Sequence, residues 1–183
     1  KGHLAMIKQY AKMADRVVIM VSPLPRPLSD GSPVSFEISK QIWNIYLDAE
    51  GLTDRVAVIR SPVNSPVEAS FQYIANEENK PEYAQPGQKI ILGTSTKGGD
   101  ESRFAADSQK YAREGVTVEV KPLKSLGNIS ATDMRKAIAE KNLEQIQKFL
   151  PDSVNKKAVA KQILSMFSTK QNIDRKSTRL NSS

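Results

Sequence analysis

The sequence contains no cysteine and only one histidine, and both shortages exclude particular kinds of chemistry. Without a thiol, the chain has no disulfide bond, no cysteine nucleophile and no thiolate metal site. A single imidazole cannot build a histidine-rich zinc site. We therefore predict no metal site made by protein side chains. A divalent cation such as Mg²⁺, if the protein uses one, would be held by oxygen atoms, chiefly those of a substrate's phosphate groups.

Long apolar runs and aromatic residues are also scarce. No stretch approaches the roughly 20 apolar residues that cross a bilayer, and no signal-peptide pattern occurs in the sequence. Both observations favour a cytoplasmic protein without a membrane partner. Aromatic residues make up only 6% of the chain, and they do not alternate with a basic stripe, as they do in many proteins that bind single-stranded nucleic acid.

Positive charge, by contrast, is abundant, with a formal net charge of +7. Such a charge suits a polyanionic ligand, and the shortage of aromatics favours a small phosphate ligand over nucleic acid. Hydrophobic residues make up 39% of the 183 residues, which is enough for one globular domain with a hydrophobic core.

Short apolar runs alternate along the chain with stretches of helical periodicity. Val17–Val21 is a continuous run of β-type residues, which is typical of a strand buried on both faces of a parallel sheet. Such runs predict strands at residues 17–22, 56–59, 89–93 and 116–120. Helical patterns predict helices at residues 3–14, 36–50, 67–78, 101–114, 131–141, 143–150 and 153–168. This alternation predicts a doubly wound α/β fold, built on a parallel sheet, with a C-terminal helical segment.

The helix predicted at residues 36–50 has the clearest ends, because Ser35 can cap its start and Gly51 can close it. Its predicted core face consists of Ile38, Ile42, Ile45 and Ala49. In the helix predicted at residues 101–114, the expected core residues are Phe104, Ala105 and Tyr111. Clustered prolines and glycines predict a loop over residues 23–33 and a linker over residues 79–88.

One stretch, Ile129 to Arg135, combines residues that suit phosphate chemistry. Ser130 followed by Asp133 resembles a capping box and predicts a helix start. Thr132 and Arg135 are three residues apart and therefore share a face, while Met134 and Ile138 form a core-facing stripe on the other side. Free backbone N–H groups, a hydroxyl and a guanidinium at one helix start form an anion site. The same spacing also fits an ordinary capped helix with a solvated arginine.

The N-terminus carries a second signal, since it reads Lys1-Gly2-His3 just before a predicted helix. A Gly-His step at one helix start and Ile-Ser-x-Thr-x-x-Arg at another resemble the HIGH-motif nucleotidyltransferase superfamily. Lys1-Gly2-His3 matches the last three positions of the His-x-Gly-His signature, and residues 129–135 match the second signature throughout. The resemblance covers residues 1–165 and is nearest to the archaeal-type nicotinamide mononucleotide adenylyltransferases.

This resemblance implies a Rossmann-like sheet with strand order 3-2-1-4-5. By that analogy the first strand, which is the central one, would precede Lys1. Residues 1–168 would then form an N-terminally truncated nucleotidyltransferase domain, with an open slot between Val17–Ser22 and Lys89–Gly93. Residues 169–183 are polar and without apolar periodicity, so we predict a disordered or non-native tail.

The resemblance also implies a reaction and roles for its residues. An oxygen of a phosphorylated acceptor attacks the α-phosphorus of a nucleoside triphosphate, and pyrophosphate leaves. Gly2 lets the backbone approach the nucleotide, and His3 donates to the α-phosphate as charge builds. His3 and Arg135 are thus the predicted catalytic residues. The predicted nucleotide-binding residues are Gly2, His3, Ser22, Gly93, Ile129, Ser130, Thr132 and Arg135, of which Ser22 and Gly93 are chosen because they end predicted strands.

The substrates are less strongly encoded. We favour ATP over CTP, bound together with Mg²⁺. The acceptor is a small phosphorylated molecule, namely nicotinamide mononucleotide, phosphopantetheine, a flavin nucleotide or a phosphorylated alcohol. The alternatives are a cytidylyltransferase, a nucleotide-binding module without catalysis, and a basic RNA- or DNA-binding domain. A homo-oligomer is left open.

Overall fold

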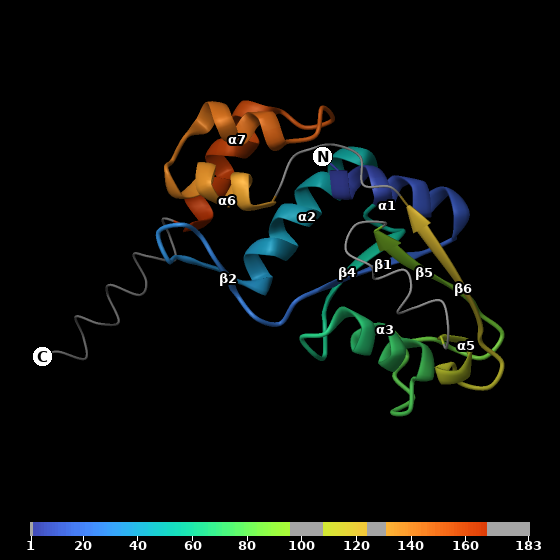
Figure 1. The fold of residues 1–183 in the computed structure, drawn as a ribbon. Coiled ribbons are helices and arrows are strands. Elements are labelled where there is room, and N and C mark those ends of the chain that lie inside the picture. Colours follow the sequence, from blue (N-terminus) through green and yellow to red (C-terminus); the bar gives the residue numbers. More distant parts are fainter. Residues whose placement is uncertain (1, 96–107, 124–130, 168–183) are drawn as a thin grey trace, which may run out of the picture. The chain divides into compact units, whose positions relative to one another are not determined.

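The computed structural model describes residues 2–95, 108–123 and 131–167 (Figure 1). The chain forms two compact units. The sheet unit contains residues 2–24 and 55–127, and the helical unit contains residues 25–54 and the chain from residue 128 onward. Within the described ranges, no helix is long and apolar enough to cross a bilayer.

The described part of the sheet unit contains two pairs of parallel strands. β1 (Val17–Val21) pairs with β4 (Val56–Arg60), in register from Val17 opposite Val56 to Val21 opposite Arg60. β5 (Lys89–Ser95) pairs with β6 (Thr117–Leu123), starting from Lys89 opposite Thr117. The predicted strands and their parallel arrangement are therefore confirmed, although β5 and β6 run on past the predicted ends. Among the described residues no ladder joins the two pairs.

Helices cover both faces of the β5–β6 pair. On one face, Ile90 and Leu92 of β5 pack with Val118 and Val120 of β6 against Ile74 of α3 (Pro66–Ala75). Side chains alternate along a strand, so the neighbouring positions face the other way, where the helix α1 (Gly2–Met13) lies. Figure 1 shows α1 on one side of the strands and α3 on the other. This double covering confirms the α/β class.

The short helix α5 (Ser108–Tyr111) follows residues that lie outside the described ranges. Tyr111 was expected in the core, and this prediction is wrong, because 53% of its surface is exposed. One face of its ring stacks on Phe71 at a centroid distance of 4.6 Å, and the rest of the ring faces solvent. The predicted core residues Phe104 and Ala105 lie outside the described residues.

The side chain of Gln109, in α5, pairs with the outer edge of β6. Its Nε2 donates to the Val116 carbonyl oxygen (2.9 Å), and its Oε1 accepts from the Val118 N–H (2.8 Å). One amide thus takes the place that a neighbouring strand would occupy. Such pairing protects an edge strand from joining other chains.

In its described residues, the helical unit packs four helices around one apolar core. These are α2 (Phe36–Glu50), α6 (Ala131–Ala139), α7 (Leu143–Phe149) and a helix over residues 156–167. Its buried residues come from both segments of the unit: Leu28, Ile38, Ala137, Ile138, Ile146, Leu150, Val159, Ala160, Ile163 and Phe167. The stretch predicted as a loop contains a short antiparallel pair, β2 (Arg26–Pro27) and β3 (Pro33–Val34), so that prediction is wrong there.

The ends of α2 are as predicted, but its core face is not. Ser35 Oγ accepts from the Ile38 N–H (3.3 Å), and Gly51 closes the helix at a φ of 68°. Ala49, expected in the core, is exposed, because the contacts of α2 with the core end at Tyr46. Leu47 is only 1% exposed and lies nine residues after Ile38, on the opposite side of the helix. α2 therefore buries side chains on two faces.

Candidate functional site

The start of α6 brings two predicted site residues together. Arg135 Nη2 donates to Thr132 Oγ1 at 3.1 Å, with Thr132 exposed and Arg135 half-buried. Behind them, Met134 packs against the apolar core and Ile138 is buried in it, which confirms the predicted core stripe. The hydroxyl and guanidinium therefore share the solvent side of the first turn, at the positive end of the helix dipole, which favours an anion. Ile129 and Ser130 lie outside the described residues.

Gly2 and His3 open α1 in the sheet unit. Leu4 is buried and anchors the first turn, while His3 is exposed beside it. The first turn of α1 itself carries no acidic side chain that would oppose an anion at the positive end of the helix dipole. An exposed imidazole at such a helix start can donate to an approaching anion.

Ser22 and Gly93 have roles in local structure that the sequence did not predict. Ser22 follows β1, as predicted, and its Oγ accepts from the Leu24 N–H (3.3 Å). Gly93 does not end its strand, because β5 continues to Ser95, so its predicted place at the strand end is wrong. A Cβ at Gly93 would lie 2.6 Å from the Tyr10 ring, closer than real Cβ atoms approach other atoms. Gly93 therefore makes room for Tyr10.

Tyr10 is a residue that sequence reasoning missed. Its hydroxyl donates to the Lys121 carbonyl oxygen at 2.7 Å, and its side chain is buried. The sequence holds no signal for this contact, because it joins residues 111 positions apart.

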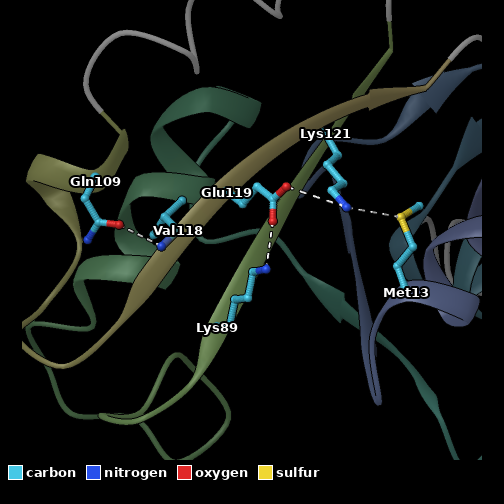
Figure 2. A network of polar contacts seen from close by, with 6 residues as sticks. All are labelled: Met13, Lys89, Gln109, Val118, Glu119 and Lys121. Atoms are coloured by element: carbon cyan, nitrogen blue, oxygen red, sulfur yellow. Dashed lines mark hydrogen bonds and ion pairs between the residues drawn. The ribbon is translucent and has the colours of Figure 1, made fainter.

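A charged network lies on the same face of β5 and β6 (Figure 2). Glu119 contacts Lys89 Nζ at 2.9 Å and Lys121 Nζ at 3.6 Å, and Lys121 Nζ lies 3.9 Å from Met13 Sδ. The hydrogen bond from Lys89 is the main cause that lowers the pKa of Glu119 below its usual value of 4.5. Glu119 therefore stays ionised and neutralises part of this basic surface. Within the described ranges, no group of three or more His, Cys, Asp or Glu side chains could hold a metal ion.

The predicted site residues are divided between the two units. Gly2, His3, Ser22 and Gly93 belong to the sheet unit, whereas Thr132 and Arg135 belong to the helical unit. The structure brings Thr132 and Arg135 into contact. The predicted meeting of His3 with Arg135 at one nucleotide stays a prediction.

Parallel strands, with helices on both faces of the β5–β6 pair, define a doubly wound α/β protein. Among solved structures, the chain is similar to the crystal structure of a bifunctional NMN adenylyltransferase/ADP ribose pyrophosphatase from Francisella tularensis. The TM-score is 0.55 at 17% sequence identity, and the match covers 98% of this chain and 52% of that one. The chain thus spans about half the length of that protein, and the similarity is one of fold. No protein-family model matches the sequence, and no curated protein is significantly similar to it.

Proposed function

We propose that the protein is a nucleotidyltransferase, which transfers an adenylyl group from ATP to a small phosphorylated acceptor such as nicotinamide mononucleotide. The observation that carries the proposal is the contact between Thr132 and Arg135 at the start of α6. This contact lies within the Ile-Ser-x-Thr-x-x-Arg stretch, where a hydroxyl and a guanidinium suit phosphate oxygens. A fold like that of an NMN adenylyltransferase supports the same class of reaction.

In the proposed reaction, an acceptor phosphate oxygen bonds to the α-phosphorus of ATP, and the bond from that phosphorus to the bridging oxygen of the β-phosphate breaks. Pyrophosphate leaves with the electron pair. The chain needs no nucleophile of its own, so its contribution is positioning and charge stabilisation. Thr132 and Arg135 would hold the β- and γ-phosphates, and His3 would donate to the α-phosphate as negative charge builds there.

Mg²⁺ needs few protein ligands, because the ion is usually bound through one or two carboxylates together with a substrate's phosphate oxygens. We propose that the ion enters with the triphosphate, whose oxygens hold it in many nucleotide-dependent enzymes. In this proposal the chain's own side chains and helix starts bind the phosphates and donate to the α-phosphate.

A comparison of two neighbouring basic residues tests the proposal. Arg135→Ala should weaken ATP binding by about 1.5–3 kcal/mol, because it removes charge-assisted hydrogen bonds to phosphate. Adenosine lacks the phosphates and should therefore bind equally well to the wild-type protein and to Arg135→Ala in calorimetric titrations. Lys136→Ala removes one charge from an exposed position of the same helix and should have little effect. If Arg135→Ala weakened the binding of ATP and adenosine equally, Arg135 would not be a phosphate-binding residue.

Pyrophosphate release then separates the alternatives. The proposal expects release that depends on ATP and on an acceptor such as nicotinamide mononucleotide. Release with CTP instead would indicate a cytidylyltransferase. Nucleotide binding without release for any of the four acceptor classes would indicate a nucleotide-binding module that does not catalyse the reaction.

A further inference from the structure

Tyr10 attaches α1 to the β5–β6 pair through its hydroxyl and its ring. The hydroxyl donates to the main-chain oxygen of Lys121 at 2.7 Å. The ring occupies the space left by Gly93, whose Cβ would collide with it at 2.6 Å from Cζ. Both partners of Tyr10 belong to the main chain, since Lys121 contributes a carbonyl oxygen and Gly93 has no side chain. The contact therefore fixes the distance between α1 and the β5–β6 pair.

The end of α1 that carries Tyr10 makes further contacts with the sheet unit. Arg55, just before β4, donates through Nη2 to the carbonyl oxygens of Ala11 and Ala14, the latter at 2.9 Å. Met13 contacts the Lys121 side chain, as Figure 2 shows. The second half of α1 is thus fastened to both strand pairs. Within the first half, Leu4 is buried whereas His3 is exposed.

His3 lies on the same side of α1 as Tyr10. The two residues are seven positions apart, which is close to two turns, so His3 lies about 10 Å further along the helix axis. In Figure 1, β5 and β6 run towards the beginning of α1. By this helical geometry, His3 would lie towards the carboxyl ends of these strands, where open α/β sheets bind ligands.

We propose that Tyr10 is a positioning residue that fixes where His3 stands at the carboxyl ends of β5 and β6. The hydrogen bond from the Tyr10 hydroxyl to Lys121 fixes α1 at a point two turns after His3. The contact of the Tyr10 ring with Gly93 sets the distance of α1 from the sheet. The catalytic meaning of this position rests on the proposed function, in which His3 faces the α-phosphate. The positioning itself is a property of the folded chain without nucleotide.

The single histidine provides a direct readout. Its imidazole C–H resonance in the NMR spectrum reports on the beginning of α1 alone, since the chain holds no other histidine. Tyr10→Phe keeps the ring and removes only the hydroxyl, so it should shift and broaden the His3 resonance. Tyr111→Phe makes the same chemical change at an exposed tyrosine and should leave it unchanged. If both variants give the wild-type resonance, Tyr10 does not position His3.

A second pair of variants tests the contact with Gly93. Gly93→Ala should displace the His3 resonance, because the added Cβ collides with the Tyr10 ring. In a Tyr10→Ala background, Gly93→Ala should add little, since the ring that it strikes has gone. Additive effects of the two substitutions would overturn the proposed coupling. This comparison remains informative even if one single variant is destabilised.

Adding ATP separates this inference from the proposed function. In the wild-type protein, ATP with Mg²⁺ should move the His3 resonance if His3 faces a phosphate. If ATP has no effect, the proposed function loses support, whereas the variants without nucleotide still decide the role of Tyr10. Where pyrophosphate release is measurable, Tyr10→Phe should lower kcat with little change in the KM for ATP, because the substrate's β- and γ-phosphates are held elsewhere.

Discussion

Asn76 shows how much one residue can organise. It ends α3 in a left-handed conformation (φ 43°, ψ 51°) and is only 3% exposed. Its Nδ2 donates to the carbonyl oxygens of Lys80 and Ala84, both at 3.0 Å, and its Oδ1 accepts from the Lys80 N–H at 2.7 Å. These three bonds close residues 76–84 into a compact loop, so the segment predicted as a linker over residues 79–88 has no helix or strand but is ordered by side-chain hydrogen bonds.

Two substitutions of Asn76 should separate its backbone from its side chain. Asn76→Gly tolerates the left-handed conformation, so its cost of about 1–3 kcal/mol in the free energy of unfolding comes from buried groups left unpaired. Asn76→Ala should cost about 1 kcal/mol more, because a Cβ disfavours that conformation. Urea denaturation measures both. A glycine variant as stable as the wild type would show that water replaces these hydrogen bonds at no cost.

Single residues also mark the limit of the sequence. The start of α6 was predictable, because Thr132 and Arg135 interact within one helical turn. Gly93 was noticed for the wrong reason, since the ring that requires it belongs to Tyr10 on a distant helix. Only glycine fits at position 93 because of the way α1 lies on β5, and no local sequence pattern encodes that packing.

At the scale of elements, β5 and β6 are joined by charge as well as by their backbone ladder. Glu119 on β6 forms ion pairs with Lys89 of β5 and with Lys121 of its own strand (Figure 2). The folded protein therefore holds the pKa of Glu119 below its usual value of 4.5. A carboxyl whose pKa is lower in the folded state stabilises the fold above its unfolded pKa, and this contribution is lost as the pH falls through the folded pKa.

Glu119→Gln should accordingly flatten the pH dependence of stability on the acid side. At neutral pH the variant should be slightly less stable than the wild type, and the difference should vanish as the pH is lowered below 4.5. Raising the salt concentration should shrink it as well, because the pair is exposed. Thermal melts from acid to neutral pH provide the comparison, with Glu140→Gln on the exposed surface as the control. A difference that persists in acid would point to lost packing rather than lost charge.

Elements with strong local signals were predicted well. Ser35 and Gly51 bound α2 as expected, because caps act within a few residues. The apolar runs of β1 and β4 likewise give their strands. The two-residue strands at Arg26–Pro27 and Pro33–Val34 escaped prediction, because such short strands have no periodicity. Their prolines favoured a loop, and only the pairing between them reveals the hairpin.

At the scale of the whole molecule, the helical unit draws its core from segments far apart in the sequence. Ile38 of α2 shares one buried cluster with Ala137 and Ile138 of α6 and with the later helices. The phenol of Tyr46 packs against the same cluster, and burial raises its pKa to about 12. The apolar face of α2 therefore depends on residues from 131 onward.

Ending the chain at Gly127 should expose this face while leaving the sheet unit's apolar cluster around Ile74 and Leu92 intact. We expect the shortened protein to bind the dye ANS and to aggregate more readily than the full chain. Tyr46 should then titrate near 10 rather than about 12, as spectrophotometric titration compared with a Tyr46→Phe variant will show. A shortened chain with a buried Tyr46 and no dye binding would mean that α2 is covered by something other than the C-terminal helices.

The two segments of the helical unit are also synthesised at different times. Of the helices in this unit, α2 leaves the ribosome first, and residues 55–127 must all be made before its partners in α6 and α7 appear. At typical translation speeds this interval lasts roughly 4–15 s. For that time the apolar side of α2 lacks the residues of α6 and α7 and can contact only earlier members of the cluster, Leu28 and Val34, while the sheet unit can already form. Slow codons between residues 55 and 127 would lengthen the exposure and increase the dependence of the newly made chain on chaperones.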